Sequence, residues 1–210
     1  MPERLDATTL AKARRTLARR DPRLTRLLRE VGPCRIEQRG DPYRALLRSV
    51  LYQQLAGSAA AAIARRFCAP YRGRYPKPAD LLAAPVTQLR AAGLSRQKIA
   101  ALRAVAEAFD SRALDNRRLR RMDDDAVVEA VTQVHGIGTW TAHMLLMFSL
   151  ARPDVLPTGD YGVRKGAMLV YALGDLPKPK QLEAIAELWR PYRSVGSWYM
   201  WRALETVTPR

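Results

Sequence analysis

The sequence predicts an all-α fold, and three observations support this prediction. Apolar residues recur at helical spacing along most of the chain, and no run of any length shows the alternation of a β-strand. Helix start signals, an acidic or hydroxyl residue followed by the apolar stripe, recur at intervals. With 210 residues, of which 48% are apolar, the chain can fill one sizeable domain or two small lobes.

The N-terminal 40 residues contain two predicted helical segments. Thr8 or Thr9 can cap the first, and Asp21 followed by Pro22 opens the second, because proline favours the first helical position. Both segments are rich in arginine. A solvated helix face explains most of these arginines, and contact with a polyanion remains open for a few of them.

Asp41 and Pro42 repeat the same start signal, and the buried stripe that follows leads to a turn at Gln53–Gly57. Ser58 can cap the next helix, an alanine-rich run that ends at Phe67. The turn between these two helices is a place where an amide or an apolar side chain can protrude.

The rest of the chain continues the helical pattern. Two short helices are predicted over 78–94, and Ser95 caps a long helix that runs through Phe109. A basic patch at 117–121 precedes the next helix. Further predicted helices span 123–133, 139–150, 161–173, 182–189 and the C-terminal segment around Trp198–Trp201.

Two of these helices, 123–133 and 139–150, are joined by a tight turn that contains Gly136 and Gly138 and form a helix-hairpin-helix. Glycine lacks a Cβ, so this turn can bend sharply and let a phosphate approach the backbone. The N–H groups that open the second helix, beginning at Thr139, form an anion site at its positive dipole end. The alternative is an ordinary helical hairpin whose glycines only close the turn.

A second feature favours a functional hairpin over an ordinary one: Asp160 lies 22 positions after Gly138, at the start of another helix. Pro157 and Gly159 precede it and form a loop that can hold the carboxylate in a fixed place. Asp160 can be merely the N-cap of that helix, or the cap and a functional carboxylate together.

Composition restricts the class of partner. The net charge of +16, dominated by arginine, predicts a polyanion, although an arginine-rich proteome would inflate this count. No basic amphipathic segment, apolar spanning run or signal peptide is apparent, so a cytoplasmic, nucleoid-associated protein without membrane contact is expected. Two cysteines are too few for a disulfide scaffold or a four-cysteine metal site, and no zinc spacing is present.

The hairpin and the Asp160 loop together resemble the helix-hairpin-helix (HhH-GPD) DNA glycosylases, and most closely their AlkA-like 3-methyladenine branch. The resemblance covers roughly residues 41–201. It implies a monofunctional glycosylase that flips cationic alkylated purines, such as 3-methyladenine and 7-methylguanine, out of duplex DNA. The enzyme would then hydrolyse the N-glycosidic bond in base excision repair.

The resemblance also implies roles for single residues. Asp160 would be the catalytic carboxylate. Trp140 stands where bifunctional relatives carry a nucleophilic lysine, so no AP-lyase activity is expected, and its indole face would attract a cationic base. Trp201 matches a second pocket tryptophan, and Met144 stands where the family has a tyrosine. The alternative for both tryptophans is a place in the core.

Contacts with DNA follow from the same resemblance. Gln54 and Leu55 align with a pair that enters the minor groove and fills the gap left by the flipped nucleotide, although Leu55 can instead be core. Gly136, Gly138 and Thr139 would contact a phosphate. No cofactor is expected beyond an alkali ion, which the hairpin of this family can hold through backbone carbonyls.

The implied layout has one lobe at 41–152, with the helix-hairpin-helix at about 123–150. A second lobe, 1–40 plus 153–210, carries the Asp160 loop, and an active-site cleft is expected between the lobes. A monomer bound to damaged double-stranded DNA is expected. Two alternatives remain: a glycosylase for a different lesion, since Met144 changes the pocket, or a non-catalytic helix-hairpin-helix DNA-binding protein.

Overall fold

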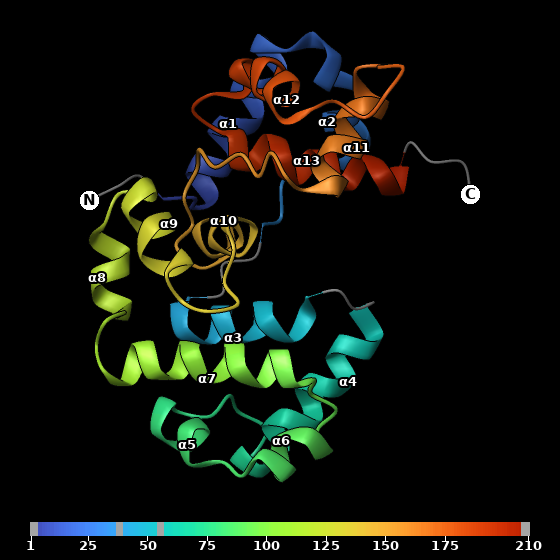
Figure 1. The fold of residues 1–210 in the computed structure, drawn as a ribbon. Coiled ribbons are helices and arrows are strands. Elements are labelled where there is room, and N and C mark those ends of the chain that lie inside the picture. Colours follow the sequence, from blue (N-terminus) through green and yellow to red (C-terminus); the bar gives the residue numbers. More distant parts are fainter. Residues whose placement is uncertain (1–3, 37–39, 54–56, 207–210) are drawn as a thin grey trace. The chain divides into compact units, whose positions relative to one another are not determined.

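The computed structural model describes residues 4–36, 40–53 and 57–206, and within these ranges it contains helices and no strand (Figure 1). The predicted all-α fold is therefore confirmed. The chain forms two compact units, one of residues 39–145 and one that combines 1–38 with 146–210. None of the described helices is both long and apolar enough to cross a bilayer.

The unit of residues 39–145 is built around the contact of α3 with α7, which lie side by side in Figure 1. Leu46, Leu47, Leu102 and Val105 are fully buried in it. Its elements are α3 (Pro42–Tyr52), α4 (Gly57–Cys68), η2 (Ala69–Tyr71), α5 (Pro78–Ala83), α6 (Val86–Ala91), α7 (Arg96–Asp110), α8 (Asn116–Arg121), α9 (Asp124–Thr132) and most of α10 (Thr139–Phe148).

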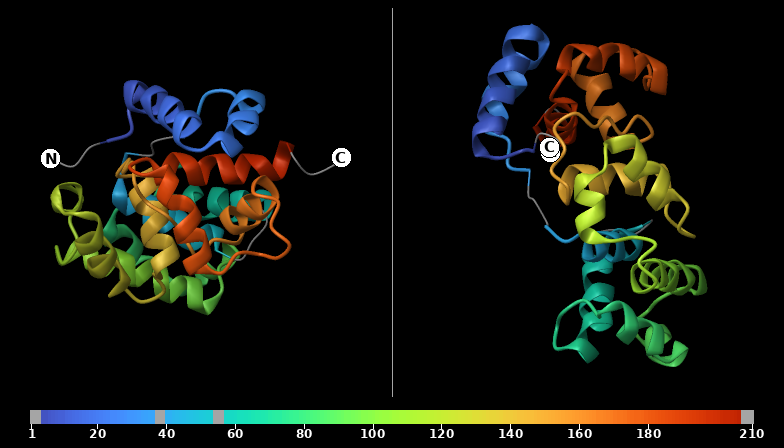
Figure 2. Two further views of the ribbon diagram at one scale, coloured as in Figure 1. Left: turned by 90° about the horizontal axis from the view of Figure 1, so that it is seen from above. Right: turned by 90° about the vertical axis from the view of Figure 1, so that its left-hand side faces the viewer.

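The other unit is organised around its C-terminal helix. Both views of Figure 2 show the two N-terminal helices along one side of this helix. Val195, Tyr199, Met200 and Ala203 are fully buried on it. The elements are α1 (Ala7–Arg20), η1 (Pro22–Leu24), α2 (Thr25–Val31), α11 (Tyr161–Val170), α12 (Pro179–Ala186), η3 (Glu187–Trp189) and α13 (Arg193–Thr206).

Most of the predicted helix starts are correct. The side chains of Asp41, Ser95 and Asp123 each accept a hydrogen bond from a backbone N–H in the first turn of the helix that follows. Two predicted caps are wrong. Asp6, in extended conformation, caps α1 by accepting from Thr9 N–H at 2.7 Å, so the threonines already lie inside the helix. Helix α4 begins at Gly57, so Ser58 is helical too.

A buried polar network joins the two ends of the chain within their shared unit. Asp21, only 1% exposed, accepts hydrogen bonds from the Tyr171 hydroxyl and from Arg23 N–H. Trp189 Nε1 donates to the Tyr171 oxygen at 2.8 Å. Burial and the hydrogen bond to Asp21 raise the pKa of Tyr171, so its phenol stays protonated and donates. The network explains how the N-terminal helices are held against the C-terminal ones.

Candidate active site and nucleic-acid interface

The segment that leads to Asp160 is fixed at its start by the first turn of α13. Arg193 forms a two-pronged ion pair with Asp154, with Nε 2.8 Å from Oδ1 and Nη2 2.9 Å from Oδ2. The Ser194 hydroxyl donates to the Arg152 carbonyl at 2.7 Å and accepts from Val155 N–H at 3.0 Å. Paired donors of this kind fix orientation as well as distance. The segment therefore leaves α13 in a defined direction.

Asp160 is the N-cap of α11. Its backbone is extended, and its Oδ1 accepts from Val163 N–H at 2.8 Å. A cap of this type stabilises a helix by about 0.5–2 kcal/mol and holds the carboxylate at the positive end of the helix dipole. The side chain is half-buried. Capping accounts for part of its role, as one of the two interpretations of the sequence predicts.

Trp201 supplies a second fixed donor to the same carboxylate. Its indole Nε1 donates to Asp160 Oδ1 at 2.9 Å, and its ring stacks on Phe148 with centroids 5.8 Å apart. Gly162 makes this arrangement possible, because a Cβ there would lie 2.8 Å from Trp201 Cδ1. Trp201, which the family resemblance implies as a pocket residue, thus orients the candidate catalytic group.

The predicted helix-hairpin-helix is present, with α9 ending at Thr132 and α10 beginning at Thr139. Ile137 N–H donates to the Val134 carbonyl at 3.0 Å and closes the turn. Gly136 has φ +81°, and a Cβ on it would lie 2.4 Å from the Cβ of Ala101. Gly138 faces open space, where a Cβ would meet nothing within 4 Å. The two glycines therefore differ: one is required by the fold, and the other leaves room beside the backbone.

The turn after α3 is tied to this hairpin by Gln53. Its Nε2 lies 3.3 Å from the Gly136 carbonyl, to which it donates, and 3.5 Å from Thr141 Oγ1. The predicted wedge residues Gln54 and Leu55 follow immediately but lie outside the described residues. Their roles remain predictions.

The accessible face of α10 carries the residues predicted to contact a base. Trp140 is 42% exposed, which excludes the interpretation of this residue as core. Met144 and His143 are half-buried and follow it at i+4 and i+3, which places all three on one side of the helix. Burial lowers the pKa of His143, so its imidazole is neutral at neutral pH. Thr139 is exposed at the start of the same helix.

A hairpin of this form, followed by Asp160 after a loop that contains Pro157 and Gly159, is the combination on which the sequence resemblance rests. The family described as "HhH-GPD superfamily base excision DNA repair protein" matches residues 47–191. The chain belongs to the HhH-GPD superfamily.

Curated and solved relatives agree with this assignment. DNA-3-methyladenine glycosylase 1 of Schizosaccharomyces pombe is 35% identical over 200 residues, covering 93% of this chain and 88% of the relative. A structure of S. pombe 3-methyladenine DNA glycosylase in complex with abasic DNA has a TM-score of 0.84 at 34% identity, covering 91% and 95% of the two chains. The structure of the DNA-3-methyladenine glycosidase of Bacillus halodurans also has a TM-score of 0.84, at 35% identity, and the match covers 93% of this chain and 90% of that one.

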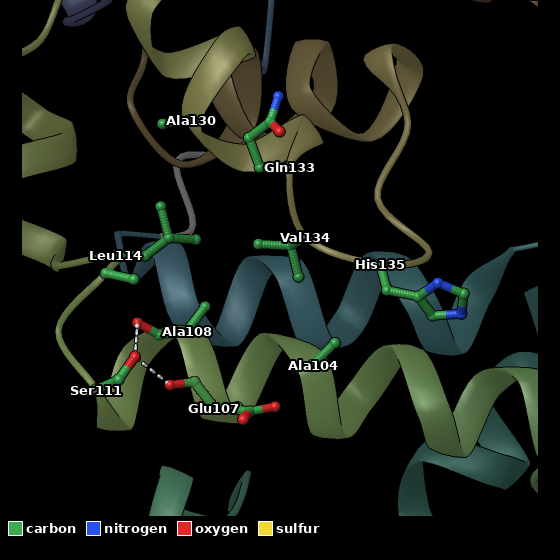
Figure 3. Close-up of a pocket in the computed structure, with 10 residues that line it drawn as sticks. Ala104, Glu107, Ala108, Ser111, Leu114, Ala130, Gln133, Val134 and His135 are labelled. Atoms are coloured by element: carbon green, nitrogen blue, oxygen red, sulfur yellow. Dashed lines mark hydrogen bonds between the residues drawn. The ribbon is translucent and has the colours of Figure 1, made fainter.

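The 39–145 unit of this HhH-GPD protein contains a cavity of about 510 Å³. Figure 3 shows the residues that line it. It lies between the end of α7 and the hairpin, and Ser111 there donates to the Glu107 carbonyl at 2.7 Å. Trp140, Met144 and Thr139 do not line it. The cavity is therefore separate from the face of α10 predicted to contact a base.

The ions expected at an HhH-GPD hairpin are alkali cations held by main-chain oxygens. The Val134 and Gly136 carbonyls each accept one hydrogen bond, and a carbonyl oxygen has a second lone pair, so they fit such an ion. Within 4–36, 40–53 and 57–206, no group of three or more His, Cys, Asp or Glu side chains could hold a metal.

Three features of the HhH-GPD site were missed from the sequence. They are the Asp154–Arg193 ion pair, the stacking of Phe148 on Trp201, and the link from Gln53 to the hairpin. Each joins residues far apart in the chain, so spacing gives no signal for it. The one available signal was the position of Gln53 at the turn after a buried stripe, which indicated that its side-chain amide could protrude.

Proposed function

We propose that this HhH-GPD protein is a monofunctional DNA glycosylase. It excises cationic alkylated purines, such as 3-methyladenine and 7-methylguanine, from duplex DNA by flipping the base and hydrolysing its N-glycosidic bond, in base excision repair. The observation that carries the proposal is Asp160, a carboxylate held by a backbone N–H and by the Trp201 indole. The names of the two relatives that match most of this chain support the substrate class.

Asp160 acts at C1′ of the damaged nucleotide. The C1′–N bond breaks, its electron pair leaves with the cationic base, and the base departs neutral. The carboxylate stabilises the positive charge that develops on the sugar and orients the water that adds to C1′. That water loses a proton to the carboxylate or to solvent, and an abasic sugar remains. No general acid is needed, because a cationic base is already a good leaving group.

Trp140, Met144 and Trp201 are the residues that we assign to the flipped base. An indole face attracts a cation by about 0.5–2 kcal/mol, and stacking of a base on an aromatic ring is worth about 1–3 kcal/mol. The attraction for a cation favours a positively charged purine over a neutral one, whereas stacking stabilises either. The flexible thioether of Met144 next to Trp140 also suits other base shapes, so a glycosylase for a different lesion is the second candidate.

The hairpin is assigned to the DNA backbone. Gly136, Gly138 and Thr139 would contact a phosphate, because the N–H groups that open a helix such as α10 attract an anion and Gly138 leaves space for it. An alkali ion at the Val134 and Gly136 carbonyls would supply positive charge for the same phosphate. Gln54 and Leu55 would fill the gap left by the flipped nucleotide.

Trp140 has no amine and cannot form a Schiff base with the abasic sugar, which supports base release without strand cleavage. The partner is double-stranded DNA that contains a damaged base. One hairpin and one carboxylate serve one lesion, so we assign the protein as a monomer. As a DNA repair enzyme it would work on nucleoid DNA in the cytoplasm.

The test is release of free bases from methylated duplex DNA, separated by chromatography, followed by gel analysis of the strand. We expect 3-methyladenine or 7-methylguanine to appear, and the strand to break only after alkali treatment. Release of other damaged bases from suitable duplexes would favour the second candidate. DNA binding without release of any base would contradict the enzyme assignment and favour a non-catalytic binding protein.

Alanine substitutions at the two hairpin glycines separate folding from DNA binding. Gly136→Ala places a side chain at φ +81° against Ala101 and should destabilise the fold by about 1–3 kcal/mol. Gly138→Ala meets nothing within 4 Å and should leave stability unchanged. Its methyl group takes the space of the phosphate, and affinity for duplex DNA should fall about tenfold, equivalent to one charge-assisted hydrogen bond of about 1.5 kcal/mol.

These two outcomes are measured by chemical denaturation and by fluorescence anisotropy with labelled duplex DNA. Wild-type affinity in the Gly138→Ala variant would show that no phosphate approaches the backbone there.

A further inference from the structure

Helix α1 carries a basic stripe that the proposed active site does not use. The helix contains five basic residues and no acidic residue. Lys12, Arg15 and Arg19 are all exposed. They follow one another at i, i+3 and i+7, the spacing that places side chains on one face of a helix. These three residues are the basic stripe.

Other cations of the same unit are engaged in intramolecular contacts. Arg14 donates to the Leu28 carbonyl at 2.9 Å, and Arg26 pairs with Glu30 at 2.8 Å. In the described part of the chain, no residue forms a hydrogen bond or ion pair with the side chains of the basic stripe. Solvated helix faces usually alternate charges at i and i+4, whereas like charges at that spacing, such as Arg15 and Arg19, destabilise a helix. The stripe therefore requires a reason other than helix stability.

The opposite face of α1 is occupied. Ala13 and Leu17 are fully buried in the unit. A membrane-surface helix needs a free apolar face to enter the headgroup region, so α1 does not fit that partner. A polyanion that contacts only the outer face fits better.

We propose that Lys12, Arg15 and Arg19 bind the phosphate backbone of duplex DNA as a second, sequence-independent contact, separate from the hairpin. This inference rests on the proposed function, since it takes DNA as the partner. From Lys12 to Arg19 the helix rises about 10 Å, because each residue adds about 1.5 Å. One DNA strand carries a phosphate about every 3.4 Å of its axis, so the stripe spans about three phosphates.

Such a contact would help the protein to stay on undamaged DNA while it searches for a damaged base. Phosphate contacts carry no sequence information and let a protein hold to undamaged DNA and slide or hop along it. The chemistry at Asp160 would not depend on it. The stripe thus affects how DNA is held before a lesion is engaged.

The test is the salt dependence of binding to undamaged duplex DNA, measured by anisotropy for wild type and for Lys12→Gln/Arg15→Gln/Arg19→Gln. Each phosphate contact contributes about 0.9 to the slope of log K against log salt concentration, so the slope should become shallower by about 2.7. Glutamine keeps good helix propensity at exposed positions. If the triple variant unfolds at a lower temperature than wild type, Arg15→Gln alone should still make the slope shallower by about 0.9.

The matched control is Arg29→Gln/Lys178→Gln/Lys180→Gln, which removes the same charge from exposed positions on α2 and at the start of α12 in the same unit. Its slope should stay at the wild-type value. An unchanged slope in the stripe variant would overturn the proposal, because the three side chains would then neutralise no phosphate. An equal change in the control would also overturn it, since net charge alone would then explain binding.

Base release by saturating enzyme in a single turnover separates this inference from the proposed function. The stripe variant should release methylated bases at the wild-type rate. If the wild type released none, the proposed function would fail, while the comparison of slopes would still decide the stripe.

Discussion

Replacing Asp160 with asparagine is expected to lower base release from methylated DNA by about 10²–10⁴-fold, the range lost when one charged or proton-transferring group is removed. Asparagine has nearly the same shape and is an equally good N-cap. Its amide oxygen can still accept from Val163 N–H and from Trp201 Nε1, the two donors to Oδ1 in the wild type. The substitution therefore removes the charge and keeps the geometry.

Two measurements accompany this variant. Single-turnover release of free base gives the rate, and binding to duplex DNA with an abasic-site analogue shows whether the site can still be occupied. We expect the rate to collapse and the affinity to stay within a few-fold of wild type. Normal release by Asp160→Asn would show that the mechanism proposed above is wrong.

Asp123 provides the matched control. It is also an N-cap aspartate, and it accepts from Ala126 N–H at 2.8 Å at the start of α9. Asp123→Asn makes the same chemical change in the same kind of local structure, away from Asp160 in the chain. It should release bases at the wild-type rate. A loss equal to that of Asp160→Asn would mean that capping, rather than catalysis, explains the effect.

The parts of the fold that were predicted correctly from the sequence depend on local rules. The caps at Asp41 and Ser95 follow from short-range hydrogen bonding, and the hairpin follows from two glycines between apolar helices. Local rules also explain the error at the start of α1, because Asp6, Thr8 and Thr9 are all candidate caps within three residues and the chain uses Asp6. Helix α4 begins at Gly57, one residue before the predicted cap.

The contacts that position Asp160 could not be predicted in the same way. Trp201 lies 41 residues later, and the pair forms only because α11 packs on α13. The sequence suggested Trp201 as a pocket residue through the family resemblance, but nothing in its spacing indicated a hydrogen bond to the carboxylate. Likewise, Asp154 and Arg193 are 39 residues apart. Long-range pairs of this kind depend on which helices pack together. A periodic pattern predicts that a helix has an apolar face, but not which helix packs against that face.

The packing of α11 on α13 leads to the second large expected effect. Gly166 lies against the backbone of Met200: a Cβ built on it would lie 2.1 Å from the Met200 carbonyl oxygen and 2.8 Å from its Cα. Backbone cannot rotate away as a side chain can. Gly166→Ala must therefore push the two helices apart, and overpacking of this kind usually costs about 1–3 kcal/mol, occasionally more.

Separation of these helices also acts on the site, because α11 begins directly after Asp160 and Trp201 follows Met200 on α13. Gly166→Ala should lower the free energy of unfolding, measured by chemical denaturation, and slow base release in the fraction that remains folded. Gly174→Ala is the control, since its Cβ would meet nothing within 4 Å and both quantities should stay at wild-type values. A stable, fully active Gly166→Ala variant would mean that α11 and α13 need not approach this closely. A less stable variant that releases bases at the wild-type rate would instead show that this packing supports the fold without positioning Asp160.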